Sequence, residues 1–502
     1  MFDRASANSI LLSMVKFLKM RQSYQFFVSK FYPIPVEQDI ASSSFILGMA
    51  GLTLAQALQH GNGIFSYVGI FLLSLALLFL FVILSFGKPV ESVKTFFKKI
   101  SFPVLFLGMV WQLYQLWHTL PGISLLPSAA STLWLFKLGV GLAGCLAALS
   151  LLPKNWISSA WQNLLVVLTL VVVWFLGVWA IQTAPQPKID VFVFHQTSAQ
   201  ALLSGENPYT AKVPNIYGDL PYYGAELVDE QGNLTIGNPY PPLTIYISTL
   251  GYLAGGDIRY SHLLAFVLSG ALIAFLHTGR EAKLAAYLFL FMPRAFFVLE
   301  QGWTELILVF FLAAVIFSAT RYPKLLPIML GLFFASKQYL LFMLPISLLL
   351  VANKSSWRDR LNLYGWMGGT MVAVTAPLAF WNLPAFLWNV GAAQWYTPFR
   401  IDALSYLALY ARVFDQTPSF LISFLALAIA LFVVWRIAPR TPTGFALSLA
   451  WCLAVFLAFN KQAFCNYYFL VIGAIFCAFA SLTNQTSFSQ PENLNLIPHS
   501  KS

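Results

Sequence analysis

Apolar runs of about 20 residues recur through the chain, and they constrain its fold more than any other feature. As a helix, a run of this length matches the hydrocarbon thickness of a bilayer. Within lipid every backbone polar group must be bonded inside its own segment, which favours helices. Only 9% of the 502 residues are charged, against about 25% in an average soluble chain. These features exclude a soluble enzyme, a disulfide-stapled secreted domain and a disordered scaffold. They predict an all-α polytopic membrane protein.

The apolar runs predict a helical bundle of about 14 spans. A polar break at Ser336-Lys337-Gln338 divides the segment 325–353, so we expect a hairpin of two short spans there, with Lys337 near the outer tip. Residues 241–254 are short for a crossing and predict an interfacial or re-entrant helix. The other expected spans are about 42–60, 64–87, 101–120, 128–152, 159–183, 258–277, 283–298, 303–320, 361–381, 418–438, 444–459 and 466–482.

The placement of charge predicts the topology. The net charge is +11, but the basic residues sit in short clusters between apolar runs, as in the positive-inside pattern, so nucleic acid is not an expected partner. The loop 88–99 carries four lysines and is expected to be cytoplasmic. The loop 184–257 carries seven of the 18 acidic residues and two lysines, which places it on the extracytoplasmic side. We therefore expect a multi-pass protein of the plasma (inner) membrane with both termini cytoplasmic.

This pattern of charge and hydropathy divides the chain into four parts. Residues 1–41 are predicted as a basic, amphipathic segment on the cytoplasmic membrane surface. Residues 42–158 form a four-span extension and 159–482 the main module, which contains the external loop 184–257 with juxtamembrane helices. Residues 483–502 form a polar cytoplasmic tail. The spans of the extension carry few polar residues, so we assign them packing, binding of a membrane partner, or access for a lipid substrate.

Eight cations remain at or near the outer face once the cytoplasmic clusters are set aside, and these carry most of the functional information. They are Lys188, Lys212, Arg259, Arg294, Lys337, Arg400, Arg412 and Lys461. A lysine within the membrane costs roughly 2.5–3.5 kcal/mol on insertion scales, so an embedded Lys337 requires a partner or a ligand. One interpretation is a structural ion pair with Glu300 or Glu305.

No cofactor is expected. The sequence has no P-loop, dinucleotide fingerprint, serine nucleophile elbow or C-x-x-C motif. Four cysteines lie in or beside apolar segments without pairing or metal-ligand spacing, and we interpret them as buried small hydrophobic residues. Asp190 with Glu300 or Glu305 could hold a divalent metal, but the spacing of acidic residues does not require one, so no metal site is predicted.

The start of the external loop contains the strongest candidate for chemistry. Asp190 follows the end of an apolar run, and residues 191–204 predict a helix that Gly205 ends as its C-terminal cap, before the turn Asn207-Pro208-Tyr209. A carboxylate at the water–lipid boundary can accept a proton from a hydroxyl group as a general base. It can also cap the N-terminus of the helix, and the two roles are compatible. His195 lies off the helical face of Asp190, which favours a plain interfacial histidine over a catalytic one.

This loop resembles the first external loop of the GT-C glycosyltransferases, with the bacterial polyprenyl-phosphate-mannose-dependent α-mannosyltransferases as the most similar branch. The matching residues are Asp190, Val193, Ala199, Ala201, Leu202, Leu203, Gly205, Asn207, Pro208 and Tyr209. Three further elements follow in order: Tyr240-Pro241-Pro242-Leu243, then Pro293 with Glu300-Gln301-Gly302 and Glu305, then Gly331, Lys337 and Pro345. The similarity covers about 159–482. In the family the catalytic loop follows the first span, whereas four additional spans precede that point here.

The resemblance implies a function and a role for each match. Asp190 would deprotonate the acceptor hydroxyl, which attacks the anomeric carbon of a polyprenyl-phosphate sugar with inversion. Independently of the resemblance, such chemistry needs cations near the bilayer surface to stabilise the phosphate, and we assign Lys337, Arg400, Lys461 and Arg294 to this role. The substrate pocket is expected to contain Tyr209, Tyr240, Glu300, Gln301, Glu305, Gln338 and Asn466.

The sequence therefore predicts an integral membrane glycosyltransferase of GT-C type. It would move a single sugar, possibly mannose, from a polyprenyl-phosphate donor to a lipid or glycan acceptor on the extracytoplasmic face. Two alternatives remain open. One is a transporter or flippase of lipid-linked sugars, although no inverted repeat is visible. The other is a polymer ligase that uses pyrophosphate-linked glycans, in which the large external loop comes late in the chain rather than centrally.

Overall fold

The computed structural model describes residues 40–85, 91–218, 222–351 and 356–482. The predicted N-terminal segment 1–41 lies almost wholly outside the described residues, as do the tail 483–502 and Lys88 of the basic loop. Within the described residues the structure is helical, and extended pairing is limited to two isolated bridges, Ile64–Ala403 and Val228–Leu234. The prediction of an all-α polytopic fold is confirmed.

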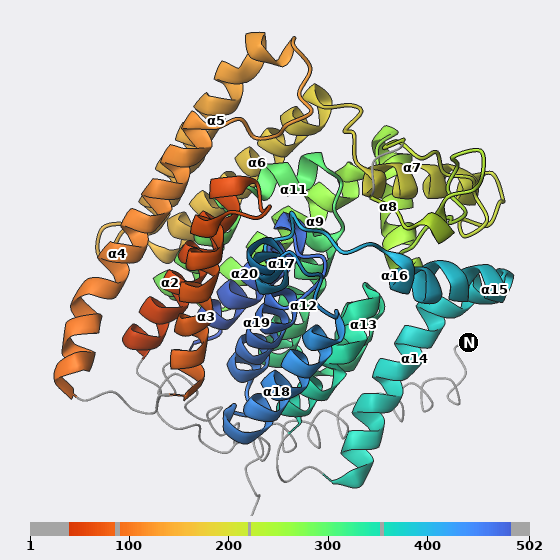
Figure 1. Cartoon of the computed structure of the whole chain (residues 1–502). Helices are drawn as coiled ribbons and strands as arrows, with labels where there is room; N and C mark the ends of the chain where they lie inside the picture. The colour runs from red at the N-terminus through yellow and green to blue at the C-terminus, as the bar shows by residue number, and fades with distance from the viewer. Residues whose placement is uncertain (1–39, 86–90, 219–221, 352–355, 483–502) are drawn as a thin grey trace, which may run out of the picture.

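The first half of the chain forms five long apolar helices at the predicted positions. They are α2 Ile40–Gly61, α3 Tyr67–Ser85, α4 Glu91–His118, α5 Ala129–Ser150 and α6 Ser159–Thr183. Figure 1 shows α4 and α5 slanting outward on one side of the bundle, with α14 (Trp357–Trp381) on the opposite side. Large apolar side chains, Trp111, Trp134 and Leu138 among them, are exposed on α4 and α5. Such surfaces are compatible with contact to lipid rather than water.

The expected interfacial helix is also present. Helix α8, Pro242–Gly255, meets α9, Arg259–Ala274, at an angle of 108°. Gly256 makes this corner possible, because its φ of +74° is the left-handed conformation that glycine adopts without strain. Pro242 at the first position of α8 has the fixed φ that begins a helix. The bend keeps α8 near one end of the bundle.

Most helices of the second half lie at the predicted positions, but one predicted span is interrupted. The span predicted at 283–298 is broken into α10, Arg280–Leu290, and α11, Ala295–Glu300. The predicted hairpin is formed by α13, Leu326–Ala335, and the 3-10 segment η3, Gln338–Leu350, with Lys337 between them. The remaining elements are α7 Asp190–Leu203, η1 Ala225–Leu227, α12 Glu305–Arg321, η2 Pro323–Leu325, α15 Leu383–Phe386, η4 Leu387–Ala392, α16 Ala393–Tyr396, α17 Tyr406–Phe414, α18 Leu421–Ile437, α19 Pro442–Ala458 and α20 Cys465–Ala480.

Within the described residues six helices have at least 18 residues and are apolar enough to cross a bilayer, or seven if the bent pair α8–α9 counts as one span. Five further apolar elements of 10–17 residues, α18, α19 and α20 among them, lie at or near predicted spans. Three of the cysteines are buried as expected, but Cys145 on α5 is exposed.

Helix α20 forms the centre of the bundle. It packs against α19, α12, α10 and α2, and nearly all of its residues are buried. Small residues allow the backbones to approach closely, as is common between membrane helices. A Cβ added at Gly51 of α2 would lie 2.6 Å from the ring of Phe476, and one at Gly473 would lie 2.6 Å from Val309. The N-terminal helices are therefore part of the same packed core as the C-terminal ones.

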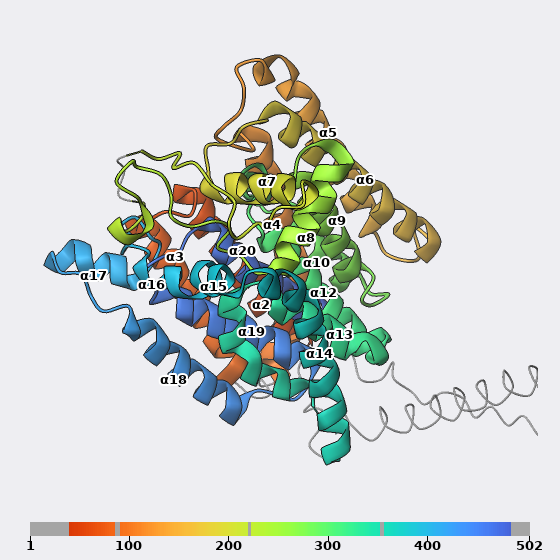
Figure 2. The same ribbon diagram turned by 90° about the vertical axis from the view of Figure 1, so that its right-hand side faces the viewer.

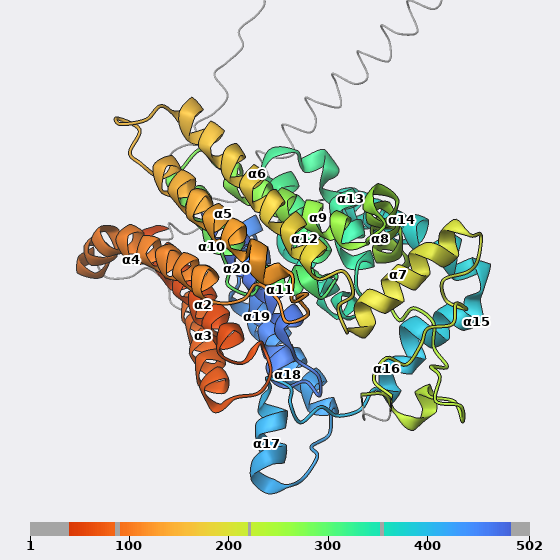
Figure 3. The ribbon, with the colours of Figure 1, turned by 90° about the horizontal axis from the view of Figure 1, so that it is seen from above.

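Several loops gather at one end of the bundle, which we call the loop face: the turn 119–128, the loop 184–241, the break 291–304 and the segments 397–405 and 460–464. Hydrogen bonds join these segments to one another and to neighbouring elements: Arg400 N–H to Lys461 O (3.0 Å), Leu126 N–H to Thr183 O at the end of α6 (2.8 Å), and Phe65 N–H to Asp402 O (2.8 Å). Figure 2 shows α7 lying across this end. Seen from above in Figure 3, α7, α15 and α16 lie at the edge opposite α4.

The packing of α2 on α20 gives a first prediction. Gly51→Ala places a methyl group against the buried Phe476 ring and should lower the free energy of unfolding by about 1–3 kcal/mol, the usual penalty of overpacking. The measurement is thermal unfolding of the purified protein in detergent. Gly365→Ala on α14 is the matched control, because nothing lies within 4 Å of a Cβ added there. An unchanged melting temperature for Gly51→Ala would contradict this packing.

Candidate functional site

Helix α7 carries the acidic residue that the sequence singles out. It runs from Asp190 to Leu203, close to the predicted 191–204. The predicted end at Gly205 is confirmed, since this residue has a φ of +78° and the next amide, Glu206 N–H, bonds back to Ala201 O at 2.8 Å. The amide of Asn238 donates to Ser198 Oγ at 2.8 Å and so ties the loop to α7. The helix is held at both its end and its middle.

Asp190 is the first residue of α7, and its side chain does not cap the helix. The N-cap is Ile189, and no side chain makes a capping hydrogen bond there. The Oδ1 atom of Asp190 accepts the neighbouring N–H of Val191 at 2.8 Å, and Oδ2 accepts the hydroxyl of Tyr223 at 3.1 Å. The backbone N–H of Asp190 donates to Tyr217 Oη at 3.2 Å. The capping interpretation is therefore wrong, although the carboxylate still lies at the favourable end of the helix dipole.

The surroundings of Asp190 alter its acidity. Burial raises the pKa of Asp190, while the hydrogen bonds from Tyr223 and Val191 and the charge of Arg400 lower it without cancelling the effect of burial. A carboxylate with a raised pKa is a stronger base than one in water. The residue also remains partly accessible, since it is not among the fully buried side chains. Asp190 therefore has the properties that proton abstraction from a hydroxyl group requires.

Lys337 is paired with a carboxylate. Its Nζ lies 2.7 Å from Glu305 Oε1 and 3.0 Å from Thr304 Oγ1. The two side chains are 4% and 0% exposed, so the pair is shielded from water. The interpretation of Lys337 as half of an ion pair with Glu305 is confirmed. The pair as a whole is neutral, because the carboxylate of Glu305 balances the charge of Lys337.

Aromatic rings surround the lysine and connect it with Asp190. The Nζ of Lys337 lies 4.6 Å from the ring centroid of Tyr240, 5.9 Å from that of Tyr339 and 5.7 Å from that of Tyr467. Burial raises the pKa of Tyr240 well above its ordinary value, and the negative charges of Asp190 and Glu305 add to this. Tyr240 therefore lies within electrostatic reach of both carboxylates.

His195 is buried, whereas the sequence predicted an interfacial position. Its ring centroid lies 4.8 Å from that of Tyr240 and 6.3 Å from that of His262, and neither ring nitrogen has a hydrogen-bond partner. Burial, followed by the positive charges of His262 and Lys337, lowers the pKa of His195 well below its ordinary value. The imidazole is accordingly neutral.

Two more of the predicted phosphate-binding cations already have partners. Arg400 forms a two-pronged pair with Asp402, at 2.8 and 2.7 Å, between the rings of Tyr222 and Phe464. The Nζ of Lys461 donates to the backbone carbonyl oxygens of Gln394 and Trp395 in α16 and of Thr397 just after it, the shortest bond being 2.5 Å to Thr397. Both residues hold the loop face together, and Arg400 also acts on Asp190 through its charge.

Arg294 is different from the other three. It lies at the break between α10 and α11, is 9% exposed, and its Nε has no hydrogen-bond partner. No carboxylate pairs with its guanidinium in the part of the chain that the structure describes. Its contact is with the face of Phe297, at 5.7 Å. A buried guanidinium without a counter-ion is unfavourable unless an anion joins it, so Arg294 is the best-placed of the four for a phosphate group.

Glu300 links the N-terminal extension to the rest of the protein. Its Oε1 accepts the backbone N–H groups of Ile123 (3.0 Å) and Ser124 (2.5 Å), and its Oε2 accepts the amide of Gln301 at 2.8 Å. A Cβ added at Gly122 would lie 2.5 Å from the carboxyl carbon, so the turn can approach this closely because residue 122 is glycine. These bonds occupy the acceptor atoms of Glu300, a residue expected to line the substrate pocket.

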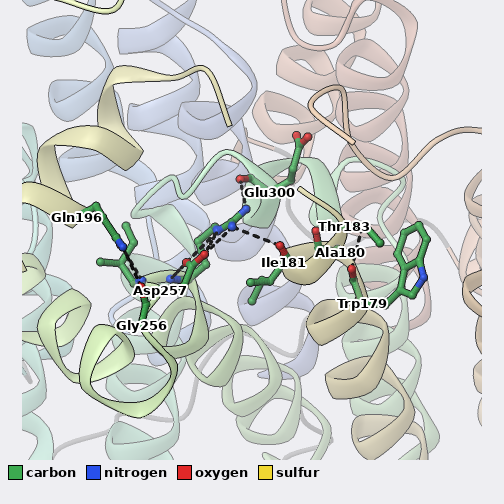
Figure 4. A network of polar contacts seen from close by, with 10 residues as sticks. Trp179, Ala180, Ile181, Thr183, Gln196, Gly256, Asp257 and Glu300 are labelled. Carbon is green, nitrogen blue, oxygen red and sulfur yellow. Dashed lines mark hydrogen bonds and ion pairs between the residues drawn. The ribbon is translucent and has the colours of Figure 1, made fainter. Parts of the chain in front are cut away.

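Arg259 extends this link to α7, and Figure 4 labels its partners Ile181, Asp257 and Glu300. Its guanidinium donates to the backbone O of Glu300 at 2.9 Å and to Ile181 O at 3.3 Å, and it is paired with Asp257 at 2.5 Å. It also lies over the ring of Phe192, 4.9 Å from its centroid. Arg259 is fully buried, so one of the eight outer cations has a purely structural position.

The other predicted pocket residues lie around the same centre. Tyr209 donates its hydroxyl to Tyr240 O at 2.9 Å. The amide of Gln338 donates to Pro239 O at 3.1 Å, while its Oε1 has no partner. Asn466 is buried at the start of α20, next to Tyr467. Sequence reasoning missed Tyr217, Tyr223 and Asp402. The richness of the loop in tyrosine was the available signal for the first two.

Comparisons with known proteins identify no family. No protein-family model matches the chain, and no curated protein matches it. Among solved structures the chain is similar to the crystal structure of ArnT from Cupriavidus metallidurans bound to undecaprenyl phosphate, with 18% sequence identity and a TM-score of 0.39. The similar region covers 66% of this chain and 60% of that chain, so the chain spans less than two thirds of the structure that it matches.

The buried ion pair gives a second prediction. Lys337→Met leaves Glu305 buried and unpaired and should lower the free energy of unfolding by about 3–5 kcal/mol. The double variant Lys337→Met/Glu305→Leu removes both charges and should recover most of that loss. Unfolding in mixed micelles measures both variants. A single variant as stable as the unaltered protein, or a double variant less stable than the single one, would show that the pair is not the stabilising contact.

Proposed function

We propose that the chain is a membrane glycosyltransferase of GT-C type. It would transfer one sugar from a polyprenyl-phosphate donor to a hydroxyl group of a lipid or glycan acceptor. The observation that carries the proposal is the combination at the loop face of a carboxylate with a raised pKa, Asp190, and a buried guanidinium without a counter-ion, Arg294. The first suits proton removal from an alcohol and the second suits a phosphate leaving group.

The proposed step assigns each residue a role. Asp190 takes the proton of the acceptor hydroxyl, and the resulting oxygen attacks the anomeric carbon from the side opposite the phosphate. A new C–O bond forms as the bond from the anomeric carbon to the phosphate oxygen breaks, so the configuration inverts. The electron pair of the broken bond remains on the polyprenyl phosphate, and the charge of Arg294 stabilises it. Tyr223 orients the carboxylate of Asp190 through its hydrogen bond.

The sequence supports the orientation of the protein in the membrane and the identity of the donor sugar. The acidic loop 184–257 and the basic clusters between the apolar runs favour an extracytoplasmic loop face in a plasma (inner) membrane with cytoplasmic termini. The motif from Asp190 to Tyr209, which resembles the mannosyltransferase branch, favours mannose as the sugar. The partners would then be a polyprenyl-phosphate sugar, a lipid or glycan acceptor and the surrounding membrane lipids.

Replacement of Asp190 tests the base. Asp190→Asn keeps the size of the side chain but cannot accept the proton, so transfer from polyprenyl-phosphate mannose, within a panel of such sugar lipids, should fall about 10²- to 10⁴-fold. The measurement is product formation by the purified protein in proteoliposomes. Asp229→Asn is the matched control, because Asp229 lies in the same loop and bonds only to its own turn.

Three outcomes would contradict this assignment. Full transfer by the Asp190→Asn variant would show that Asp190 is not the general base. Passage of the sugar lipid across the vesicle membrane without consumption would favour a transporter or flippase. Transfer from pyrophosphate-linked glycans alone would favour a polymer ligase.

The pH dependence provides an independent test. Activity needs the ionised form of Asp190, so it should be lost as the pH falls through the pKa of this group. The hydrogen bond from Tyr223 lowers that pKa. Tyr223→Phe should therefore raise the pKa and move the acid limb of the kcat/KM profile to higher pH. Tyr252→Phe on α8, whose hydroxyl contacts Gln200, is a control that should leave the limb in place. A limb that stays or moves to lower pH in Tyr223→Phe would contradict the role of Asp190.

A further inference from the structure

A set of buried polar atoms without partners lies around Lys337. We call its residues the inner polar cluster: His195, Tyr240, Glu305, Lys337, Gln338, Tyr339 and Tyr467. The atoms without partners are Glu305 Oε2, Gln338 Oε1, Tyr339 Oη and both ring nitrogens of His195. A buried polar atom without a hydrogen bond is unfavourable, because it has lost its bonds to water and gained none in return. Several in one cluster indicate that polar groups from outside the chain bind there.

The residues that carry these atoms contact the same neighbouring side chains and therefore lie close together. Lys337 bonds the other carboxylate oxygen of Glu305, and its Nζ lies over the rings of Tyr240 and Tyr339. His195 packs on Tyr240 from the side of α7. Gln338 precedes Tyr339 in the chain and bonds Pro239 O, next to Tyr240. Five segments contribute to one place: α7, the start of α12, the start of η3 with Lys337 before it, the end of the loop at Tyr240, and the start of α20 at Tyr467.

The charge of the cluster decides which groups it can accept. The ion pair of Lys337 and Glu305 is neutral overall, and burial lowers the pKa of the neighbouring His195 well below its ordinary value. Phosphate only accepts hydrogen bonds unless it is protonated, and the free oxygen of Glu305 would repel it. An ammonium group would be repelled by Lys337. Hydroxyl groups both donate and accept, so they can satisfy Glu305 Oε2, Gln338 Oε1, Tyr339 Oη and the imidazole together.

We propose that the inner polar cluster binds the hydroxyl groups of an uncharged sugar. The inference rests on the proposed function, because it places the sugar of a polyprenyl-phosphate donor in this cluster and its phosphate at Arg294. The faces of Tyr240 and Tyr467 border the sugar, and the proximity of Tyr240 to Asp190 brings the sugar near the base. Lys337 then acts as a positioning residue that holds Glu305, and not as a phosphate ligand.

Binding measurements separate this inference from catalysis. They use the Asp190→Asn protein, which binds without turnover, and two probes: a polyprenyl-phosphate hexose and polyprenyl phosphate alone. Tyr339→Phe and His195→Phe each remove hydrogen-bonding atoms but keep a ring. Each should weaken binding of the hexose lipid about threefold to tenfold and leave binding of polyprenyl phosphate unchanged. A polyprenyl phosphate that carries an amino sugar should bind less tightly than the hexose lipid.

A matched control excludes a general effect of tyrosine hydroxyls. Tyr406→Phe removes a hydroxyl that bonds Ser74, and Ser74 keeps its bond to Ile70 O, so neither probe should bind differently. The inference is overturned if both probes weaken equally in Tyr339→Phe and His195→Phe, if neither weakens, or if the amino-sugar lipid binds best. Failure of every polyprenyl-phosphate probe to bind the unaltered protein would instead overturn the proposed function, and the inference with it.

Discussion

The buried ion pair between Lys337 and Glu305 is the interaction on which the rest of the site depends. It joins the start of α12 to the break before η3, at the point where the predicted hairpin turns. With either charge alone, this part of the bundle would contain an uncompensated ion in a medium of low dielectric constant. Paired, the two charges produce a neutral, hydrogen-bonding environment beneath the loop face. That neutrality is the reason why the proposed function assigns the phosphate group to Arg294 rather than to Lys337.

A second constraint ties the N-terminal extension to this site. The carboxylate of Glu300 is held by the turn at Gly122, Ile123 and Ser124, and its backbone carbonyl is held by Arg259. Arg259 in turn packs on Phe192 of α7, the helix that begins with Asp190. The extension is thus bonded to the element that positions the acidic residue. This contact argues that residues 42–158 support the geometry of the loop face, in addition to any contact with lipid or with a membrane partner.

The features that the sequence predicted well are local ones. Hydropathy placed α2 to α6, the short helix α8 and the extent of α7, because each depends on the composition of one segment; glycine placed the end of α7 at Gly205. The break at 291–294 was not predicted, because hydropathy averages across the short segment that contains Pro293 and Arg294. The partners of Asp190 could not be predicted, because Tyr223 lies 33 residues away in an irregular loop.

The cations of the loop face show why charge placement alone overestimates a site. Sorting the cations by the side of the membrane assigned four residues to one phosphate group. A cation in a largely apolar protein, however, needs a partner within the chain or outside it. Arg400 pairs with Asp402, Lys461 donates to three carbonyl groups and Lys337 pairs with Glu305. The partner of Arg400 is an acidic residue two positions away, and the partners of Lys461 and Lys337 lie in other segments. The sequence around each cation does not indicate that these pairs form. Arg294 has no acidic partner among the described residues, which is why the proposed function assigns the phosphate group to it.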